Sequence, residues 1–176
     1  MNDNLPASDS RYSRRRVWLR RIVEVMLFVA LVSGIRLWQQ RDIPGITPPL
    51  SGTQLDGSPY TLPAKPGQPV LVHFWATWCS ICRIDQDSIA AIARDHPNTI
   101  TVAMQSGSSE EVSRHLAKQG VRFPAMNDTD GRIADMWGVH AVPASFILGP
   151  DGQIRFVEVG YTTGLGLRLR LWLAGR

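Results

Sequence analysis

A run rich in β-branched and aromatic residues, PVLVHFWA at 69–76, leads directly into Cys79 and Cys82, the only two cysteines of the chain. Such a run suits a strand that is buried on both faces of a sheet. From Ser80 to about Arg94, isoleucines recur at helical spacing. The chain is therefore predicted to pass from a buried strand into a helix at the cysteine pair, which favours an α/β fold.

Beyond residue 51 the same alternation of strand and helix continues, with an Asp-Gly hairpin signal within the first segment. The predicted strands and hairpin segments are 53–62, 69–76, 99–105, 144–149 and 153–160. The predicted helices are 80–94, 108–120 and 131–137. Strands joined by crossover helices pair in parallel, and a closing hairpin adds antiparallel strands. The prediction is a central mixed sheet with helices on both faces.

The C-terminal segment 164–176 is ambiguous, because leucine at every second position suits a strand. A helix would instead give four apolar residues one shared face: Leu165, Leu169, Trp172 and Leu173. We predict a helix here.

The positive charge of the chain is concentrated at its N-terminal end. Residues 1–41 contain eight arginines and three acidic residues, a net charge of +5, whereas the other 135 residues carry a net charge of −1. A nucleic-acid-binding protein is expected to carry its basic excess on the folded domain. The distribution therefore argues against a nucleic-acid partner.

The arginines precede the apolar stretch IVEVMLFVALVSGI at 22–35, a pattern that holds the N-terminus in the cytoplasm. Extension to Trp38 gives 17 residues, near the lower limit for a tilted span. A cleaved signal peptide and an amphipathic helix of a soluble protein are the alternatives. We predict a single-pass protein with four parts: a cytoplasmic basic tail (1–16), a transmembrane anchor (17–38), a proline-rich linker (39–50) and an exported domain (51–176).

Two cysteines three residues apart, at a strand-to-helix junction, suit redox chemistry. At a helix N-terminus, unpaired N–H groups and the helix dipole stabilise a thiolate at Cys79. Cys82 would lie one turn further along the same face. It could then form a disulfide with Cys79 and resolve a mixed disulfide with a partner.

Other uses of the cysteine pair fit less well. A zinc site needs two further ligands, and no second C-x-x-C or H-x-x-x-H motif is present. Haem attachment needs a histidine after the second cysteine, where this chain has Arg83. A disulfide that closes so short a loop stabilises a fold little. No resident metal or cofactor is predicted, although the reduced pair could bind Cu(I).

The segments FWATWCSIC (74–82) and VPASFILGPDGQI (142–154) resemble the thioredoxin superfamily, and more closely its membrane-anchored, extracytoplasmic TlpA-like branch. The tail GYTTGLGLRLRLWLA (160–174) is similar to the suppressor-for-copper-sensitivity D group of that branch. The resemblance implies a thioredoxin fold and a protein disulfide oxidoreductase that faces the periplasm from the inner membrane.

The resemblance also implies roles for individual residues. Cys79 would be the nucleophile and Cys82 the resolving cysteine, with Trp78 beside them. Pro143 would be a cis proline that faces the pair. The backbone of Val142 would then be free to bind an extended substrate segment.

The sequence departs from the family pattern at three places. His73 occupies the position of a buried acid in thioredoxins, six residues before the first cysteine. It is either a core residue or a candidate proton acceptor for Cys82. Ser80-Ile81 replaces the usual Gly-Pro, so the redox potential cannot be transferred from the family. Asp87 stands where a proline usually kinks the helix.

From these observations we expect a membrane-anchored periplasmic thiol:disulfide oxidoreductase that reduces cysteines of partner proteins under copper or oxidative stress. The resemblance also implies a DsbD-like electron donor in the membrane. Two alternatives stay open: a thiol reductant for cytochrome c maturation, and a Cu(I)-binding protein that uses the cysteine pair as ligands.

Overall fold

The computed structural model describes residues 18–31, 46–63 and 66–176. The chain divides into two units, Met1–Arg41 and Asp42–Arg176. In the first unit, residues 18–31 form a helix with exposed apolar side chains. Within the described ranges, no helix combines the length and the apolar character that a membrane span needs. The predicted tail, the rest of the predicted anchor and linker residues 39–45 lie outside the described residues.

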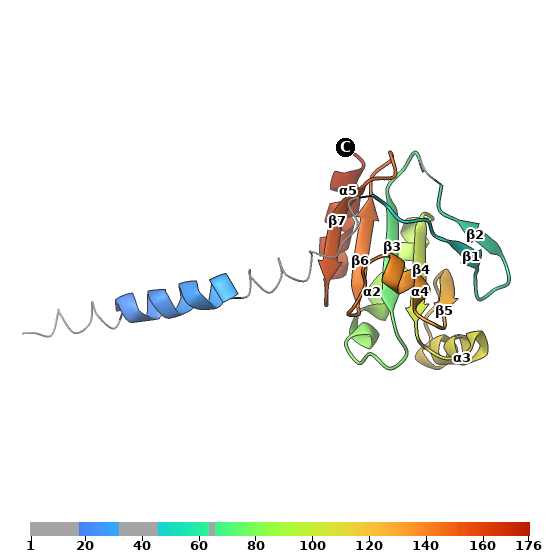
Figure 1. Cartoon of the computed structure of the whole chain (residues 1–176), viewed down its shortest axis with the longest axis horizontal. Helices are drawn as coiled ribbons and strands as arrows, with labels where there is room; N and C mark the ends of the chain where they lie inside the picture. The colour runs from blue at the N-terminus through green and yellow to red at the C-terminus, as the bar shows by residue number, and fades with distance from the viewer. Residues whose placement is uncertain (1–17, 32–45, 64–65) are drawn as a thin grey trace, which may run out of the picture. The chain divides into compact units, whose positions relative to one another are not determined.

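The second unit contains a five-stranded sheet and a separate small hairpin (Figure 1). Its strands are β1 (Ser51–Thr53), β2 (Pro59–Thr61), β3 (Val70–Trp75), β4 (Thr99–Met104), β5 (Ala125–Asp128), β6 (Ala144–Leu148) and β7 (Ile154–Val159). Its helices are α2 (Cys82–Asp95), α3 (Ser109–Gln119), α4 (Arg132–Met136) and α5 (Gly164–Ala174).

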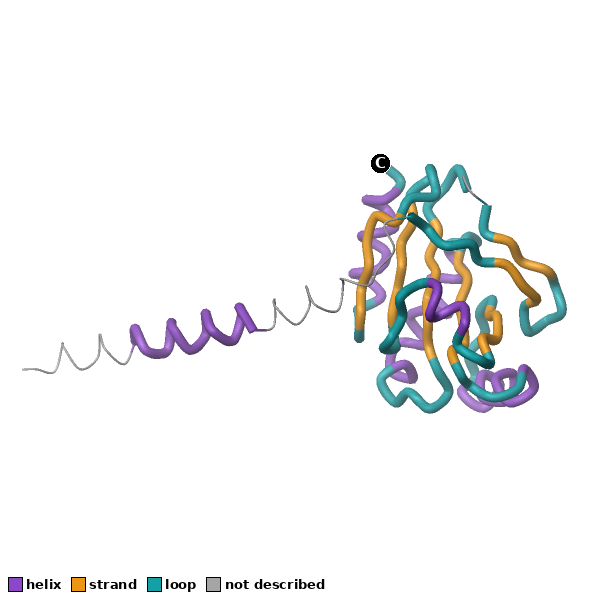
Figure 2. Tube along the Cα trace, in the orientation of Figure 1, coloured by secondary structure: helices purple, strands orange, loops and turns teal. Residues whose placement is uncertain are grey.

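The large sheet has the strand order β5-β4-β3-β6-β7. β3, β4 and β5 pair in parallel, and β6 and β7 add two antiparallel pairs. Figure 2 shows helices on both sides of these strands, with α4 on the opposite face from α2. The predicted mixed sheet with helices on both faces is confirmed.

β3 lies at the centre of the sheet, and all six of its residues are buried. Side chains alternate along a strand, so Leu71 and Trp75 join the core that contains α2 and α5. Val72 and Phe74 join the opposite core, which includes Trp137 after α4. Because β3 and β4 are parallel, their carboxyl ends meet at one edge of the sheet, and the cysteine loop begins there.

The folded unit includes residues that the sequence assigned to the linker. Leu50 is 2% exposed and accepts a hydrogen bond from the Leu62 N–H group. The Thr47 hydroxyl donates to the carbonyl of Gly152. The fold therefore begins before residue 51.

Two further features differ from the predictions. Strand β5 was not predicted, because it is short and ends in Asn127 and Asp128, which are uncommon in strands. The C-terminal helix is confirmed, but the face predicted to be shared is the exposed one. Helix α5 buries Leu167, Leu171 and Ala174 instead. The helix is apolar nearly all round, so only its contacts with the rest of the fold select the buried face.

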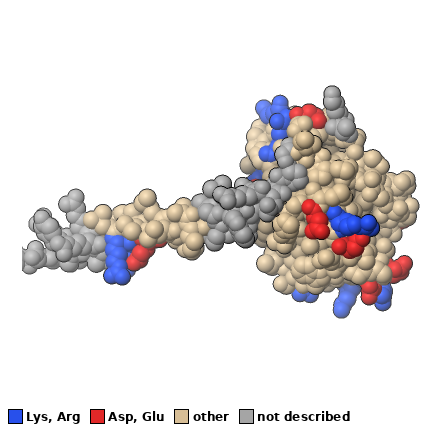
Figure 3. All heavy atoms as spheres, in the orientation of Figure 1, with Lys and Arg blue, Asp and Glu red and all other residues tan. Residues whose placement is uncertain are grey.

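Charged side chains of both signs are mixed on the surface of the second unit. On the face drawn in Figure 3, acidic and basic side chains are neighbours and do not gather by sign. Ion pairs such as Arg168–Asp95 and Arg170–Glu158, each 2.6 Å, connect α5 to α2 and to β7. Because the side chains of these pairs are partly exposed to solvent, they add little stability beyond the packing of α5.

Candidate redox site

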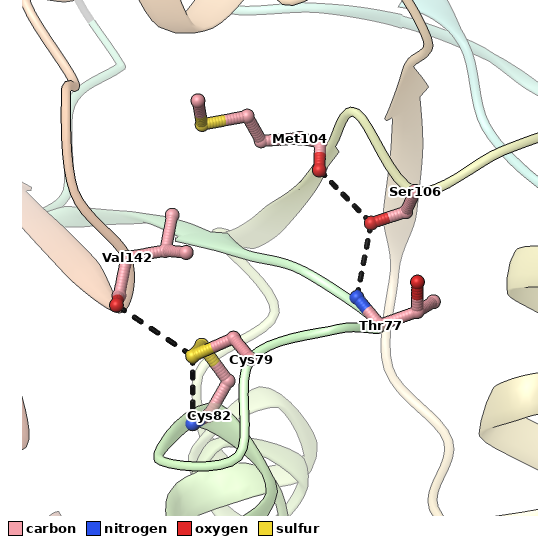
Figure 4. The surroundings of a disulfide bond; sticks show 6 residues. All are labelled: Thr77, Cys79, Cys82, Met104, Ser106 and Val142. Carbon is pink, nitrogen blue, oxygen red and sulfur yellow. Dashed lines mark hydrogen bonds between the residues drawn. A yellow bond between two sulfur atoms is a disulfide. The ribbon is translucent and has the colours of Figure 1, made fainter.

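The cysteine loop begins where β3 ends at Trp75 and enters helix α2 at Cys82. Ser80 and Ile81 form a turn, so the regular helix starts two residues later than predicted. Cys79 and Cys82 are joined by a disulfide, with their Cα atoms 5.3 Å apart (Figure 4). The structure thus represents the oxidised form of the pair.

The two sulfurs differ in burial as the sequence predicted. Cys82 is fully buried, whereas Cys79 is 7% exposed. The backbone N–H of Cys82 donates to Cys79 Sγ over 3.1 Å. On reduction, the same N–H group at the start of α2 would stabilise a thiolate at Cys79. The sulfur that can reach a partner is therefore also the one with an anion-stabilising donor.

The loop before β6 completes the surroundings of Cys79. The Val142–Pro143 peptide bond is cis, as the family resemblance implied. Cys79 Sγ lies 3.6 Å from the carbonyl oxygen of Val142 (Figure 4). Residues 63 positions apart in the chain are thus brought together at one edge of the sheet.

Trp78 flanks the pair with 61% of its side chain exposed. Its indole N–H donates to the carbonyl of Gln105 over 3.1 Å. The ring is therefore held in one place although most of its surface is open to solvent. Ile81, the residue before α2, is also exposed, by 47%. Two apolar side chains that flank the cysteines in the sequence are thus exposed.

His73 lies on the face of β3 that packs against α2. It is 2% exposed, and its Nδ1 lies 2.9 Å from the hydroxyl of Ser145 on the neighbouring strand. Burial lowers the pKa of His73 to about 3. The imidazole is therefore neutral at physiological pH and a weak base.

Asp85 is a buried titratable residue near the start of α2 that the sequence reasoning did not single out. It is 2% exposed, and its Oδ1 has no hydrogen-bond partner among the described residues. Burial raises the pKa of this carboxyl group to about 7. Three residues after Cys82, it shares that cysteine's face of α2. The only sequence signal for Asp85 was its spacing of three residues from Cys82. An acid in the first turn of a helix is also common simply because it stabilises the helix.

The redox site lies at the edge of the sheet where β3 and β4 end. A groove of about 920 Å³ lies elsewhere, lined in part by Leu55, Leu116 and Phe123, and its lining contains neither cysteine. In the described part of the chain, no group of three or more His, Cys, Asp or Glu side chains is placed to hold a metal ion.

Comparison with protein families matches residues 43–157 to the AhpC/TSA family. The match covers most of the folded unit, including both cysteines and Pro143. The chain belongs to the AhpC/TSA family.

Similarity to individual proteins indicates a more specific activity than the family match does. The chain is 27% identical over 150 residues to a thioredoxin-like protein of Haemophilus influenzae, covering 85% of this chain and 89% of the relative. It is 28% identical over 163 residues to the thiol:disulfide interchange protein CycY of Rhizobium leguminosarum, covering 84% and 88%. Among solved structures, the MTB DsbF protein has a TM-score of 0.64 at 26% identity, covering 75% of this chain and 98% of that one.

These matches agree with the geometry of the cysteine pair. The fold is thioredoxin-like, and the chain is a thiol:disulfide oxidoreductase of this family. The C-x-x-C disulfide at the start of α2 is the group that such an activity requires.

Proposed function

We propose that this chain is a membrane-tethered reductant of disulfides in partner proteins of the periplasm. The observation that carries the proposal is the asymmetry of the cysteine pair. Cys79 reaches the surface between the Cys82 N–H and the Val142 carbonyl, while Cys82 is buried behind it. This arrangement suits one cysteine that attacks and one that resolves.

The reaction starts from the reduced pair. The Cys79 thiolate attacks one sulfur of a partner disulfide, and the other partner sulfur leaves as a thiolate that takes up a proton. A mixed disulfide between Cys79 and the partner remains. Cys82 then loses its proton and attacks Cys79 Sγ, which releases the second partner thiol. Two electrons pass to the partner disulfide, and the enzyme is left in its oxidised form with the Cys79–Cys82 disulfide.

The resolving step needs a proton acceptor close to Cys82. His73 was the candidate from the sequence, but a pKa of about 3 makes it a poor base at neutral pH. Asp85 has a pKa of about 7 and an oxygen without a partner among the described residues. We assign the acceptor role to Asp85, with His73 bonded to Ser145 as a neutral core residue.

Substrate binding uses the groups around Cys79. The Val142 backbone beside Pro143 pairs with an extended segment of the partner, and Trp78 offers an exposed apolar surface. Backbone pairing places a cystine without selecting its side chains. A range of partner sequences is thereby accepted.

The anchor is assigned to residues 17–38, which place the folded unit on the periplasmic side of the inner membrane. Support comes from the arginines that precede the apolar stretch and from the exposed apolar side chains of helical residues 18–31. A tethered reductant needs a source of electrons, and a DsbD-like thiol donor in the membrane fits this position. The role under copper or oxidative stress rests on the resemblance of the tail at 160–174.

The proposal is tested with the full-length reduced protein in detergent and a synthetic disulfide peptide. We expect Cys79→Ser to abolish peptide reduction, and Cys82→Ser to stop at a mixed disulfide that intact-mass analysis detects. At pH 7, Asp85→Asn should slow resolution more than His73→Gln does. A Cys79→Ser variant that still reduces the peptide would contradict the assignment of the nucleophile.

The same assay separates the alternative functions. A strong preference for a peptide disulfide in a C-x-x-C-H sequence, over the same peptide without the histidine, would favour cytochrome c maturation. Tight Cu(I) binding by the reduced protein without peptide reduction would favour the copper-binding function. We expect peptide reduction without a large preference for the histidine.

A further inference from the structure

The loop that leads into Cys79 is held by the end of the neighbouring strand β4. The Ser106 hydroxyl accepts a hydrogen bond from the Thr77 N–H over 3.0 Å and donates to the carbonyl of Met104 over 2.9 Å (Figure 4). The indole N–H of Trp78 reaches the carbonyl of Gln105. Two successive residues before Cys79, Thr77 and Trp78, are thus bonded to two successive residues after β4, Ser106 and Gln105.

Ser106 is suited to this connection by its chemistry and its burial. It is 6% exposed, so water cannot readily replace its bonds. A hydroxyl group can donate one hydrogen bond and accept others, as this position requires. Alanine at this position would leave the Thr77 N–H without its acceptor, and the loop would lose its bond to the strand.

Gln105 is itself fixed in an unusual backbone conformation. Its φ angle is 45°, in the left-handed region that residues with side chains rarely adopt. Its N–H donates to the carbonyl of Asp128 over 2.8 Å, and its side chain lies against Gly131. Backbone strain of this kind persists where the surrounding structure holds it, often at functional sites. The carbonyl that receives Trp78 is therefore held in place from its other side.

We propose that Ser106 is a positioning residue for thiol–disulfide exchange, which holds the 76–78 loop so that the Cys79 sulfur stays beside the Cys82 N–H and the Val142 carbonyl. The inference rests on the proposed role of Cys79 as nucleophile. A hydrogen bond to a thiolate weakens as its distance grows, so a loop that shifts outward loses part of the stabilisation at Cys79. Ser106, in the segment after β4, thereby influences the reactivity of Cys79 through the 76–78 loop, without a hydrogen bond to Cys79 itself among the described residues.

The test compares Ser106→Ala with the wild type in the full-length reduced protein in detergent. Thiolate absorbance and the pH dependence of alkylation by iodoacetamide report the pKa of Cys79, and peptide reduction reports exchange. We expect Ser106→Ala to raise the pKa of Cys79 by about half a unit or more and to slow alkylation at pH 6 about threefold, since the thiolate fraction falls accordingly.

Ser108→Ala is the matched control. Ser108 is the N-cap of α3, where its hydroxyl accepts a bond from the Glu111 N–H, and among the described residues it makes no hydrogen bond to the 76–78 loop. Its loss should lower the stability of the fold but leave the pKa of Cys79 and the exchange rate unchanged. A purely structural role of Ser106 would make the two variants behave alike.

A second variant provides the test if Ser106→Ala does not fold. Trp78→Phe removes the indole N–H bond to Gln105 and keeps an aromatic ring, and it should shift the pKa of Cys79 in the same direction. A wild-type pKa in Ser106→Ala, or in Trp78→Phe where Ser106→Ala is unfolded, overturns the inference. Failure of the wild type to reduce the peptide would instead refute the proposed function, because the pKa of Cys79 is measured without any partner.

Discussion

Two buried titratable residues, His73 and Asp85, lie on the side of the sheet where α2 packs, and burial moves their pKa values away from their ordinary ranges in opposite directions. The pKa of His73 falls to about 3, and that of Asp85 rises to about 7. Both shifts favour the neutral form. At neutral pH, Asp85 is the group poised to gain or lose a proton.

Asp85→Asn is expected to change how stability depends on pH. The folded-state pKa of Asp85 lies above its unfolded value, so between about pH 4 and pH 7 the folded state binds more protons. As the pH rises and Asp85 ionises, the free energy of unfolding therefore falls by about 2 to 4 kcal/mol in total. Urea unfolding of the oxidised protein at pH 5 and pH 8 should show this loss in the wild type and not in Asp85→Asn. Equal losses in both proteins would contradict the raised pKa.

His73→Gln should change how stability depends on pH at the acidic end of the range. The folded-state pKa of His73 lies below its unfolded value, so the unfolded state binds more protons below about pH 6.5. The wild type should lose stability as the pH falls from 6.5 towards 4, and the variant should lose less. The same urea titrations measure this difference. A larger loss in the variant would show that His73 is not held neutral.

At the residue scale, the cysteine pair could be predicted because its sequence surroundings are specific, whereas the cis form of Pro143 was implied only by the resemblance to the family. Asp85 could not be singled out, because its role depends on burial, and its spacing from Cys82 also fits an ordinary helix-stabilising acid. For His73 the sequence indicated a core residue or a base. The depth of its burial now favours the core residue.

At the scale of elements, α5 offers a direct comparison of its two faces. Leu171 is 2% exposed and belongs to the core with α2, whereas Leu169 is 53% exposed. We expect Leu171→Ala to lower the free energy of unfolding by about 2 to 5 kcal/mol. Leu169→Ala should change it by less than about 0.5 kcal/mol. Chemical denaturation of both variants measures this difference in the free energy of unfolding. Equal effects would contradict the burial of the face of α5 that carries Leu171.

The sequence could not choose between these faces, since leucines point in most directions around this helix. Strand β5 was missed for a related reason. Its four residues carry too little pattern alone, and its pairing with β4 forms only in the assembled sheet. By contrast, β3 and α3 were predicted because a long β-branched run and clear capping residues specify them locally.

At the scale of the whole molecule, the second unit should fold without the first. Among the described residues, both core clusters are built from residues between Leu50 and Ala174, so the fragment 42–176 keeps the contacts within them. We expect this fragment to unfold in one cooperative transition, with a midpoint in urea that matches the full-length protein in detergent. A fragment without a cooperative transition would show that the N-terminal segment contributes to folding.

The central claim is that Cys79 and Cys82 form a reversible redox pair that works as a reductant. An equilibrium titration of the full-length protein against a dithiol–disulfide buffer tests it most directly, with mass analysis of alkylated thiols as the readout. We predict one two-electron transition with a potential near the thioredoxin end of the range, about −270 mV. A value near about −120 mV would make the protein an oxidant, and a pair that does not cycle would contradict the account.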